Sequence, residues 1–207
     1  MTSSPGTVFI VDDDPAVRTS LQTLLAMQGL PSVTYASARE FLAVFDPEAP
    51  GCVVLDMLLD GEDGLDLLRD LSSRPVRPPV IMLTAHGSVP TSVQALRGGA
   101  IDYLEKPAPP SELVACIREA LEVDRRERDV RDRRTTIEGR AQRLSGRERK
   151  VAELLIAGNR SRQIAAVLGI SVRTVEGYRA KLLEKMQAST TAQLVTMLLE
   201  SQLVPRR

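Results

Sequence analysis

Several apolar runs of the chain end in polar residues that can bind a cation or an anion. These residues are Asp12, Asp13, Asp56, Thr84 and Lys106. Carboxylates that lie close together repel one another, and a bound cation relieves that repulsion. Acidic sites rich in oxygen suit Mg²⁺ or Mn²⁺. A carboxylate beside a divalent cation and an ammonium group is suited to attack a phosphoryl group, which indicates aspartyl-phosphate chemistry.

The elements that must position these side chains follow from the alternation of short apolar runs with amphipathic stretches. Strands are expected at residues 7–11, 32–36, 52–56, 79–84 and 101–106. Nearly continuous apolar strands are typical of a parallel sheet covered by helices on both faces. In such a doubly wound α/β sheet the functional crevice lies beyond the carboxyl ends of the strands. We therefore expect the polar residues to meet at one edge of a five-stranded sheet.

The distribution of charge predicts two domains with different partners. Residues 1–122 carry 8 basic and 17 acidic side chains, a net charge of −9, whereas residues 123–207 carry 19 and 10, a net charge of +9. The basic half is expected to meet nucleic acid. No apolar run is long enough for a membrane span, and the first residues lack the pattern of a signal peptide, so we expect a cytoplasmic protein without a membrane partner.

The connection between the two halves is rich in charge, with six Arg and four acidic residues from 124 to 134. Cys116, Val123, Val130 and Ile137 recur every seven residues. This spacing predicts a helix that continues out of the first domain and ends near Gly139. Such a helix is either a solvated linker or pairs weakly with a second copy of the chain.

The last part of the chain has the pattern of a helix-turn-helix module. Helices are expected after Ser145, from Ser161 to Gly169, and after Ser171, with a fourth over 190–203. The expected core consists of Ile164, Ala165, Leu168, Ile170, Val175 and Leu182. The domains are therefore expected at 1–122, 123–140 (a charged helical linker) and 141–207 (all-α).

The first half resembles the flavodoxin-like receiver domain of bacterial two-component response regulators. The resemblance covers residues 6–122 and rests on VDDD (11–14), VVLD (53–56), MLTAHG (82–87) and DYLEKP (102–107). It implies that Asp56 accepts a phosphoryl group from a sensor histidine kinase. The implied ligands of Mg²⁺ are Asp13, Asp12 through water, Asp56 and the backbone carbonyl of Leu58. It further implies that Thr84 and Lys106 bind the phosphoryl oxygens and that Tyr103 is the switch aromatic.

Two positions near this site need separate comment. Asp60 stands where the family usually carries Pro, so we expect a looser loop after Asp56 and a changed rate of phosphorylation or phosphoryl loss. Asp14 has no role in the family pattern, and we expect it to lie near the cap of the first helix.

The tail resembles the LuxR-type DNA-binding domain of the NarL/FixJ response regulators, and together the two halves are most similar to the FixJ-like group. The motifs are LSGRERKVAELLIAG, QIAAVLGIS and RTVEGYRAKLLEKM. The resemblance makes 171–185 the recognition helix. The residues expected to reach base edges are Arg173, Glu176 and Arg179. The residues expected to contact phosphates are Thr174, Tyr178, Lys181 and Lys185.

These resemblances imply a regulator that dimerises when it is phosphorylated and binds double-stranded promoter DNA, with RNA polymerase as a further expected partner. The dimer surface is expected at 90–106 or, if the heptads pair, at 113–137. One alternative is a regulator that binds DNA without phosphorylation. Another is a magnesium-dependent phosphohydrolase, which would need an acid–base residue at the position of Leu58; we therefore expect no enzyme.

Overall fold

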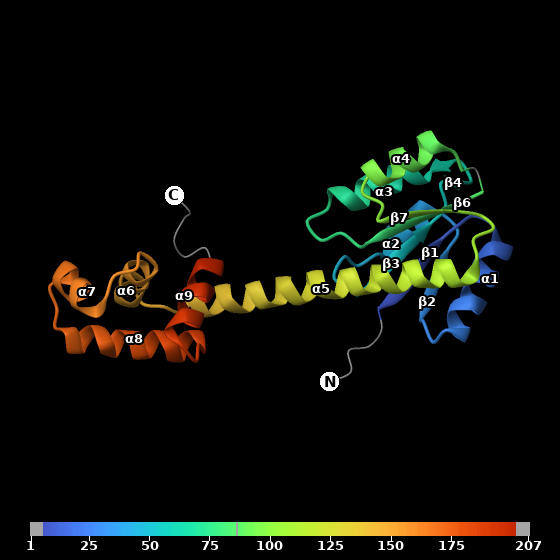
Figure 1. Cartoon of the computed structure of the whole chain (residues 1–207). Helices are drawn as coiled ribbons and strands as arrows, with labels where there is room; N and C mark the ends of the chain where they lie inside the picture. Colours follow the sequence, from blue (N-terminus) through green and yellow to red (C-terminus); the bar gives the residue numbers. More distant parts are fainter. Residues whose placement is uncertain (1–5, 86, 202–207) are drawn as a thin grey trace. The chain divides into compact units, whose positions relative to one another are not determined.

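The computed structural model describes residues 6–85 and 87–201 of the chain. The chain divides into an N-terminal unit (residues 1–127) and a C-terminal unit (residues 128–207). Helix α5 (Pro110–Gln142) contributes residues to both units. Figure 1 shows the two units with their helices and strands labelled.

The N-terminal unit is built on a five-stranded parallel sheet with the order β2-β1-β3-β6-β7. The strands are β1 (Thr7–Val11), β2 (Ser32–Tyr35), β3 (Gly51–Leu55), β6 (Val80–Thr84) and β7 (Asp102–Glu105). Every residue of β3 and of β6 is buried, as expected for central strands that are covered on both faces. The predicted five-stranded doubly wound α/β sheet is therefore confirmed.

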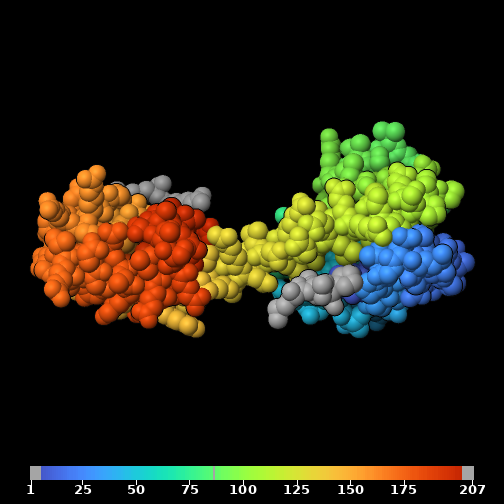
Figure 2. Space-filling model, turned by 60° about the horizontal axis from the view of Figure 1, so that its bottom comes forward, coloured from blue at the N-terminus to red at the C-terminus, as the bar shows by residue number. Residues whose placement is uncertain are grey.

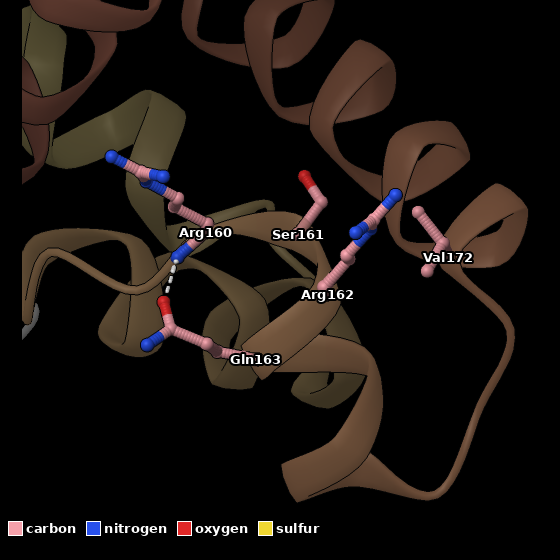
Figure 3. A pocket seen from close by; sticks show the side chains of 5 residues that line it. All are labelled: Arg160, Ser161, Arg162, Gln163 and Val172. Carbon is pink, nitrogen blue, oxygen red and sulfur yellow. Dashed lines mark hydrogen bonds between the residues drawn. The ribbon is translucent and has the colours of Figure 1, made fainter.

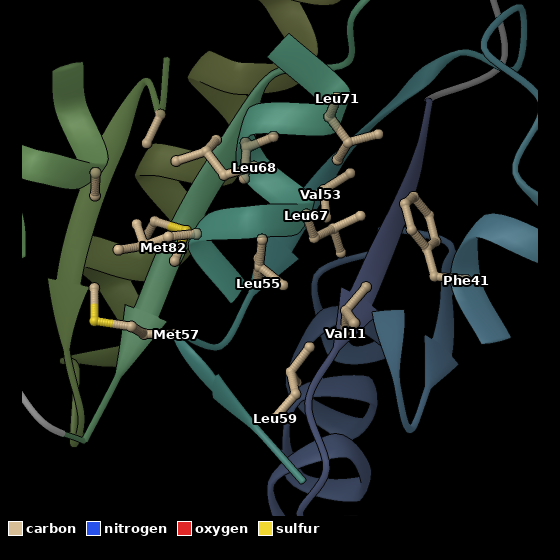
Figure 4. Packing of buried hydrophobic residues seen from close by; sticks show 14 of the residues in the cluster. Val11, Phe41, Val53, Leu55, Met57, Leu59, Leu67, Leu68, Leu71 and Met82 are labelled. Carbon is tan, nitrogen blue, oxygen red and sulfur yellow. The ribbon is translucent and has the colours of Figure 1, made fainter. Parts of the chain in front are cut away.

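Successive residues of β1 point to opposite faces of the sheet, and each face has its own core. Val8 and Ile10 pack with residues of α1 (Pro15–Met27) and α5. Phe9 and Val11 pack with α2 (Ala38–Val44), α3 (Gly64–Ser73) and α4 (Val89–Arg97). Figure 4 shows the second core, in which Phe41 of α2 and the leucines of α3 lie over the sheet.

Helix α5 is longer than the sequence predicted. It runs for 33 residues, passes the expected stop at Gly139 and ends at Gln142. The prediction was wrong because Ile137 and Ala141, each 2% exposed, belong to the core of the C-terminal unit. Their burial outweighs the cost of a glycine inside a helix, about 1 kcal/mol relative to alanine.

The first part of α5 is fixed to the N-terminal unit by a buried carboxylate. Asp124, 4% exposed, accepts a hydrogen bond of 2.9 Å from the backbone N–H of Gly51 at the start of β3. A Cβ atom at Gly51 would lie 2.1 Å from the carbonyl oxygen of Thr7, so only glycine fits at this close approach of two strands.

The C-terminal unit is helical, as predicted. Its helices after α5 are α6 (Gly146–Ile156), α7 (Ser161–Leu168), α8 (Val172–Met186) and α9 (Thr191–Glu200). Ser145 and Glu148 form the expected capping box, and Gly169 ends α7 with a positive φ of 65°. The predicted core is confirmed, with Leu168 and Ile170 at its edge. Figure 2 shows the joined surfaces of α8 and α9, in orange and red.

None of the described helices is both long enough and apolar enough to cross a membrane.

Candidate functional site

The carboxylates predicted from the sequence meet at the carboxyl edge of the sheet. Asp12 and Asp13 follow β1, and Asp56 follows the neighbouring strand β3. One carboxylate oxygen from each residue lies within 4.8 Å of the others. This proximity follows from the register, because Val11 pairs with Leu55 and both strands end at the same level.

Lys106 brings a positive charge to the same cluster from the end of β7. Its Nζ atom donates hydrogen bonds of 2.6 Å to Oδ2 of Asp12 and 2.6 Å to Oδ2 of Asp56. The backbone N–H of Lys106 donates to the carbonyl oxygen of Thr84 at 2.7 Å, which ties the ends of β6 and β7 together. One ammonium group therefore serves two carboxylates.

Burial and charge shift the pKa values of this cluster. Burial raises the pKa of Asp12, and the nearby charge of Asp56 adds to that effect, although the hydrogen bond and charge of Lys106 oppose it. Burial acts to lower the pKa of Lys106, but the bonds to Asp12 and Asp56 outweigh it and raise that pKa. Burial of Asp12 thus disfavours its charged form even with Lys106 in place.

This donor set fits a hard divalent cation. The three clustered ligand groups are carboxylates, which are oxygen donors of the kind that Mg²⁺ prefers. Asp13 is exposed to solvent, so this side of the cluster is open to the water molecules that Mg²⁺ usually keeps as ligands. The raised pKa of Asp12 indicates unmet demand for positive charge at the same place.

Asp14 does not join the cluster. Its carboxylate accepts the backbone N–H of Ala16 at 2.8 Å and caps α1. Its own N–H donates to Oδ1 of Asp12 at 2.9 Å, which orients that carboxylate. The prediction that Asp14 lies at the cap of the first helix is confirmed.

Thr84 and Tyr103 lie on the neighbouring strands. Thr84 is fully buried at the end of β6. Tyr103 is half-buried against the core beneath α4, and its hydroxyl lies 3.4 Å from the hydroxyl of Thr91 in that helix. The aromatic ring is therefore in contact with a helix outside the carboxylate cluster.

The segment after Asp56 forms a short hairpin that the sequence did not predict. Strand β4 (Leu58–Leu59) pairs with β5 (Glu62–Asp63) around Asp60 and Gly61. The backbone N–H of Leu58 donates to Oδ1 of Asp56 at 3.3 Å. Glu62 accepts the N–H of Ala38 at 2.8 Å and fixes the hairpin to the start of α2. Two-residue strands carry too little periodicity to be found in a sequence.

The cations predicted to contact DNA divide into two groups in α8. Arg179 and Lys185 have partners inside the C-terminal unit, Ser161 and Thr191 for the first and Glu148 for the second. Within the described part of the chain, Arg173 and Lys181 are exposed and make no hydrogen bond or ion pair. The remaining predicted contacts, Thr174, Glu176 and Tyr178, lie on the same helix.

A pocket of about 630 Å³ lies between the start of α7 and Val172, the first residue of α8. Its lining includes two arginines, Arg160 and Arg162, that the sequence analysis did not single out. Figure 3 shows Arg162 extending toward Val172, the first residue of α8, and Arg160 extending to the other side of Ser161. The run NRSRQ, basic residues at a predicted helix start, was the available signal.

Two family models match the chain, one in each unit. Residues 8–118 match the response regulator receiver domain, and residues 142–198 match the luxR family of bacterial regulatory proteins. The chain belongs to the response regulators of two-component systems. Its carboxylate edge therefore lies in a receiver domain, and its C-terminal unit contains a LuxR-type DNA-binding domain.

Similar proteins place this response regulator in the FixJ-like group. It is 41% identical over 198 residues to the transcriptional regulatory protein FixJ of Azorhizobium caulinodans, a match that covers 96% of this chain and 94% of that protein. It is 37% identical over 195 residues to nodulation protein W of Bradyrhizobium diazoefficiens, covering 94% and 86%.

Two solved structures match nearly the whole chain. The response regulator StyR matches with a TM-score of 0.86 and 36% identity over 95% of this chain and 100% of that one. Full-length FixJ from B. japonicum matches with a TM-score of 0.57 and 36% identity, over 98% and 100%. Several of the similar proteins are named as transcriptional regulators.

Proposed function

We propose that Asp56 of this response regulator accepts a phosphoryl group from a sensor histidine kinase, and that the phosphorylated chain dimerises and binds promoter DNA. The observation that carries the proposal is the position of Asp56. Its carboxylate contacts Lys106 and lies in one cluster with Asp12 and Asp13 at the carboxyl edge of the sheet.

The phosphoryl transfer needs a nucleophile and groups that stabilise negative charge. An oxygen of Asp56 attacks the phosphorus of a phosphohistidine, the P–N bond breaks, and the histidine ring keeps the electron pair. Lys106 contacts this carboxylate and is proposed to bind a phosphoryl oxygen. Asp12, Asp13, Asp56 and the Leu58 carbonyl would hold Mg²⁺ or Mn²⁺, which would supply further positive charge when bound.

The switch that reports phosphorylation involves Thr84 and Tyr103. Thr84 is buried at the end of β6 and is proposed to bind a phosphoryl oxygen through its hydroxyl. Tyr103 contacts Thr91 of α4 and is proposed to change its packing when Thr84 moves. The equilibrium between two arrangements of α4 would then depend on phosphorylation.

The dimer surface is proposed to lie on α4 and the segment before β7. Four large apolar side chains are exposed there: Val89, Val93, Leu96 and Ile101. The alternative surface along α5 exposes fewer large apolar side chains, because Leu113 and Ile117 are buried in the N-terminal unit and Ile137 is buried in the C-terminal unit. Val130 alone of the four heptad positions is an exposed large apolar residue there.

Promoter recognition is proposed for α8, with Arg173 toward base edges and Thr174, Tyr178 and Lys181 toward phosphates. Glu176 belongs to the predicted base-edge set, but its carboxylate accepts hydrogen bonds from Ser161 and Arg179. Lys185 and Arg179 belong to the predicted set, but both first need release from partners within the unit. Arg160 and Arg162 add positive charge at the start of α7. The domains are proposed at 1–122, 123–140 and 141–207, and RNA polymerase remains a proposed partner.

The test compares the wild type with Asp56→Asn by sedimentation in Mg²⁺, with and without acetyl phosphate. The wild type is expected to change from monomer to dimer with acetyl phosphate, and the variant to stay monomeric. Equal behaviour of both proteins, with equal DNA binding, would support a regulator that works without phosphorylation. Sustained hydrolysis of a phosphomonoester would support the phosphohydrolase, although Leu58 offers no acid–base group.

A further inference from the structure

A network of hydrogen bonds around Arg179 joins three helices of the C-terminal unit. Nη1 of Arg179 donates to Oγ of Ser161 at 2.7 Å and to Oε1 of Glu176 at 3.3 Å. Nη2 donates to Oγ1 of Thr191 at 3.1 Å. The hydroxyl of Ser161 also donates to Glu176, which closes the network.

The partners of Arg179 lie at the starts of two neighbouring helices. Ser161 is the first residue of α7, and Thr191 is the first residue of α9. Glu176 and Arg179 lie one turn apart on α8. One guanidinium group therefore fixes the starts of two helices against the middle of the helix proposed to enter DNA. Because a guanidinium is planar and rigid, its bonds to Ser161 and Thr191 also fix the orientation of α7 and α9 relative to α8.

The network also neutralises a charge that DNA would repel. The side chain of Glu176 is 54% exposed on α8, whereas that of Arg179 is 26% exposed. A carboxylate facing phosphates weakens association, and an adjacent guanidinium cancels that repulsion. For Arg179 to reach a base it would have to leave Ser161 and Thr191 and expose Glu176 without its partner.

Arg173 differs from Arg179 in its exposure and in its lack of partners within the described residues. It lies in the first turn of α8, is exposed, and has no hydrogen bond or ion pair among the described residues. Its guanidinium can reach a guanine edge without breaking any contact inside the unit.

We infer that Arg179 and Glu176 are positioning residues, and that Arg173 is the residue of α8 that determines base specificity. Arg179 holds α7 and α9 against α8 and neutralises Glu176, so its contribution is the same for every DNA sequence. Arg173 contributes only on the correct sequence. This inference rests on the proposed binding of α8 to DNA and deepens it.

The test uses the full chain with Mg²⁺ and acetyl phosphate, and a pool of duplexes with a randomised segment. Selection by the wild type yields a preferred duplex, and affinity is then measured for that duplex and a scrambled one. Arg173→Ala is expected to lose about 5- to 150-fold on the preferred duplex and about threefold or less on the scrambled one.

Arg179→Ala is expected to lose about tenfold on both duplexes, because Glu176 is left unneutralised. The double variant Arg179→Ala with Glu176→Gln should recover most of that loss, which a purely structural role of Arg179 would not produce. Lys150→Ala removes an equal charge on α6 that pairs with Glu153. It is the matched control and should lose about threefold or less on either duplex.

Thermal unfolding of each variant guards against loss of the fold. If Arg179→Ala unfolds, Thr191→Val removes one bond of the network and should show a smaller loss of the same kind on both duplexes. A change of base preference in the Arg179 or Thr191 variants, or no rescue by Glu176→Gln, would overturn the inference. A wild type that binds neither duplex would instead overturn the proposed function on which it rests.

Discussion

Each unit of the molecule contains a buried carboxylate paired with a lysine, and the two pairs behave in opposite ways. In the N-terminal unit Asp12, 2% exposed, lies 2.6 Å from Lys106. In the C-terminal unit Glu148, 3% exposed, lies 2.7 Å from Lys185. The pKa of Asp12 is raised, whereas the pKa of Glu148 is lowered.

The difference follows from how far the partners of each carboxylate offset the effect of its burial. Burial acts to raise the pKa of Glu148, but the bond from Lys185 and those from the backbone N–H and hydroxyl of Ser145 together outweigh it. Burial is the largest cause of the raised pKa of Asp12, and the bonds to Asp12 do not outweigh it. Asp12 also shares Lys106 with Asp56, whose charge adds to the rise. One pair is electrostatically complete and stabilises the fold. The other is incomplete, as expected of a site that binds a further cation.

The largest expected change in stability comes from breaking the pair between Glu148 and Lys185. Glu148→Gln removes a charge-assisted bond to Lys185 and weakens the capping box, and should lower the stability of the C-terminal unit by about 2 kcal/mol. Native-state hydrogen exchange of the amides in α6 and α8 measures this loss. The control Glu153→Gln breaks an exposed pair with Lys150 and should cost about 0.5 kcal/mol or less.

Lowering the pH should remove the stability that the Glu148 carboxylate contributes in the wild type. The pKa of Glu148 is lower in the folded chain than its ordinary value of 4.5. Its carboxylate therefore stabilises the fold above a pH of about 4.5, and this stability is lost as the pH falls through the folded-state pKa. In Glu148→Gln this part of the pH dependence should be missing. An unchanged acid profile in the variant would show that Glu148 is not a source of this stability.

Magnesium should complete the incomplete pair. At tenfold excess over its Kd, Mg²⁺ should stabilise the N-terminal unit by about 1.4 kcal/mol. Hydrogen exchange in β1 and β3 should slow, while that in α8 stays unchanged, and removal of the metal with a chelator should reverse the effect. Equal protection of both units by Mg²⁺ would contradict the assignment of the site to the carboxylate edge.

A smaller effect of opposite sign is expected from Asp12→Asn. Because the pKa of Asp12 is raised, its charged form costs stability at pH 7, and the neutral isostere should stabilise the N-terminal unit. The same variant should bind Mg²⁺ more weakly. Asp66→Asn, which alters an exposed pair with Arg69, is the control and should not stabilise. A loss of stability as large as that of Glu148→Gln would erase the contrast between the two pairs.

The sequence predicted the carboxylate edge well because backbone topology alone decides it. Once β1, β3, β6 and β7 are parallel and adjacent, residues at their carboxyl ends must meet. Capping roles such as that of Asp14 were also predictable, because they depend on neighbours within a few residues.

Side-chain partners between helices were not predictable from the sequence. Lys185 and Glu148 are 37 residues apart, and Arg179 and Ser161 are 18 apart. Only the packing of α6, α7 and α8 brings these groups together. The sequence therefore does not distinguish a charged side chain that faces solvent from one that is bonded to another helix. The end of α5 was missed for the same reason, because the burial of Ile137 is a tertiary contact.

The most direct test of the central claim is the intact mass of the chain after incubation with Mg²⁺ and acetyl phosphate. The wild type is expected to gain about 80 Da, the mass of one phosphoryl group. Asp56→Asn should gain nothing, and Asp12→Asn should gain much less than the wild type. An adduct of equal yield in Asp56→Asn would contradict the assignment of Asp56 as phosphoacceptor and of the incomplete pair as the phosphorylation site.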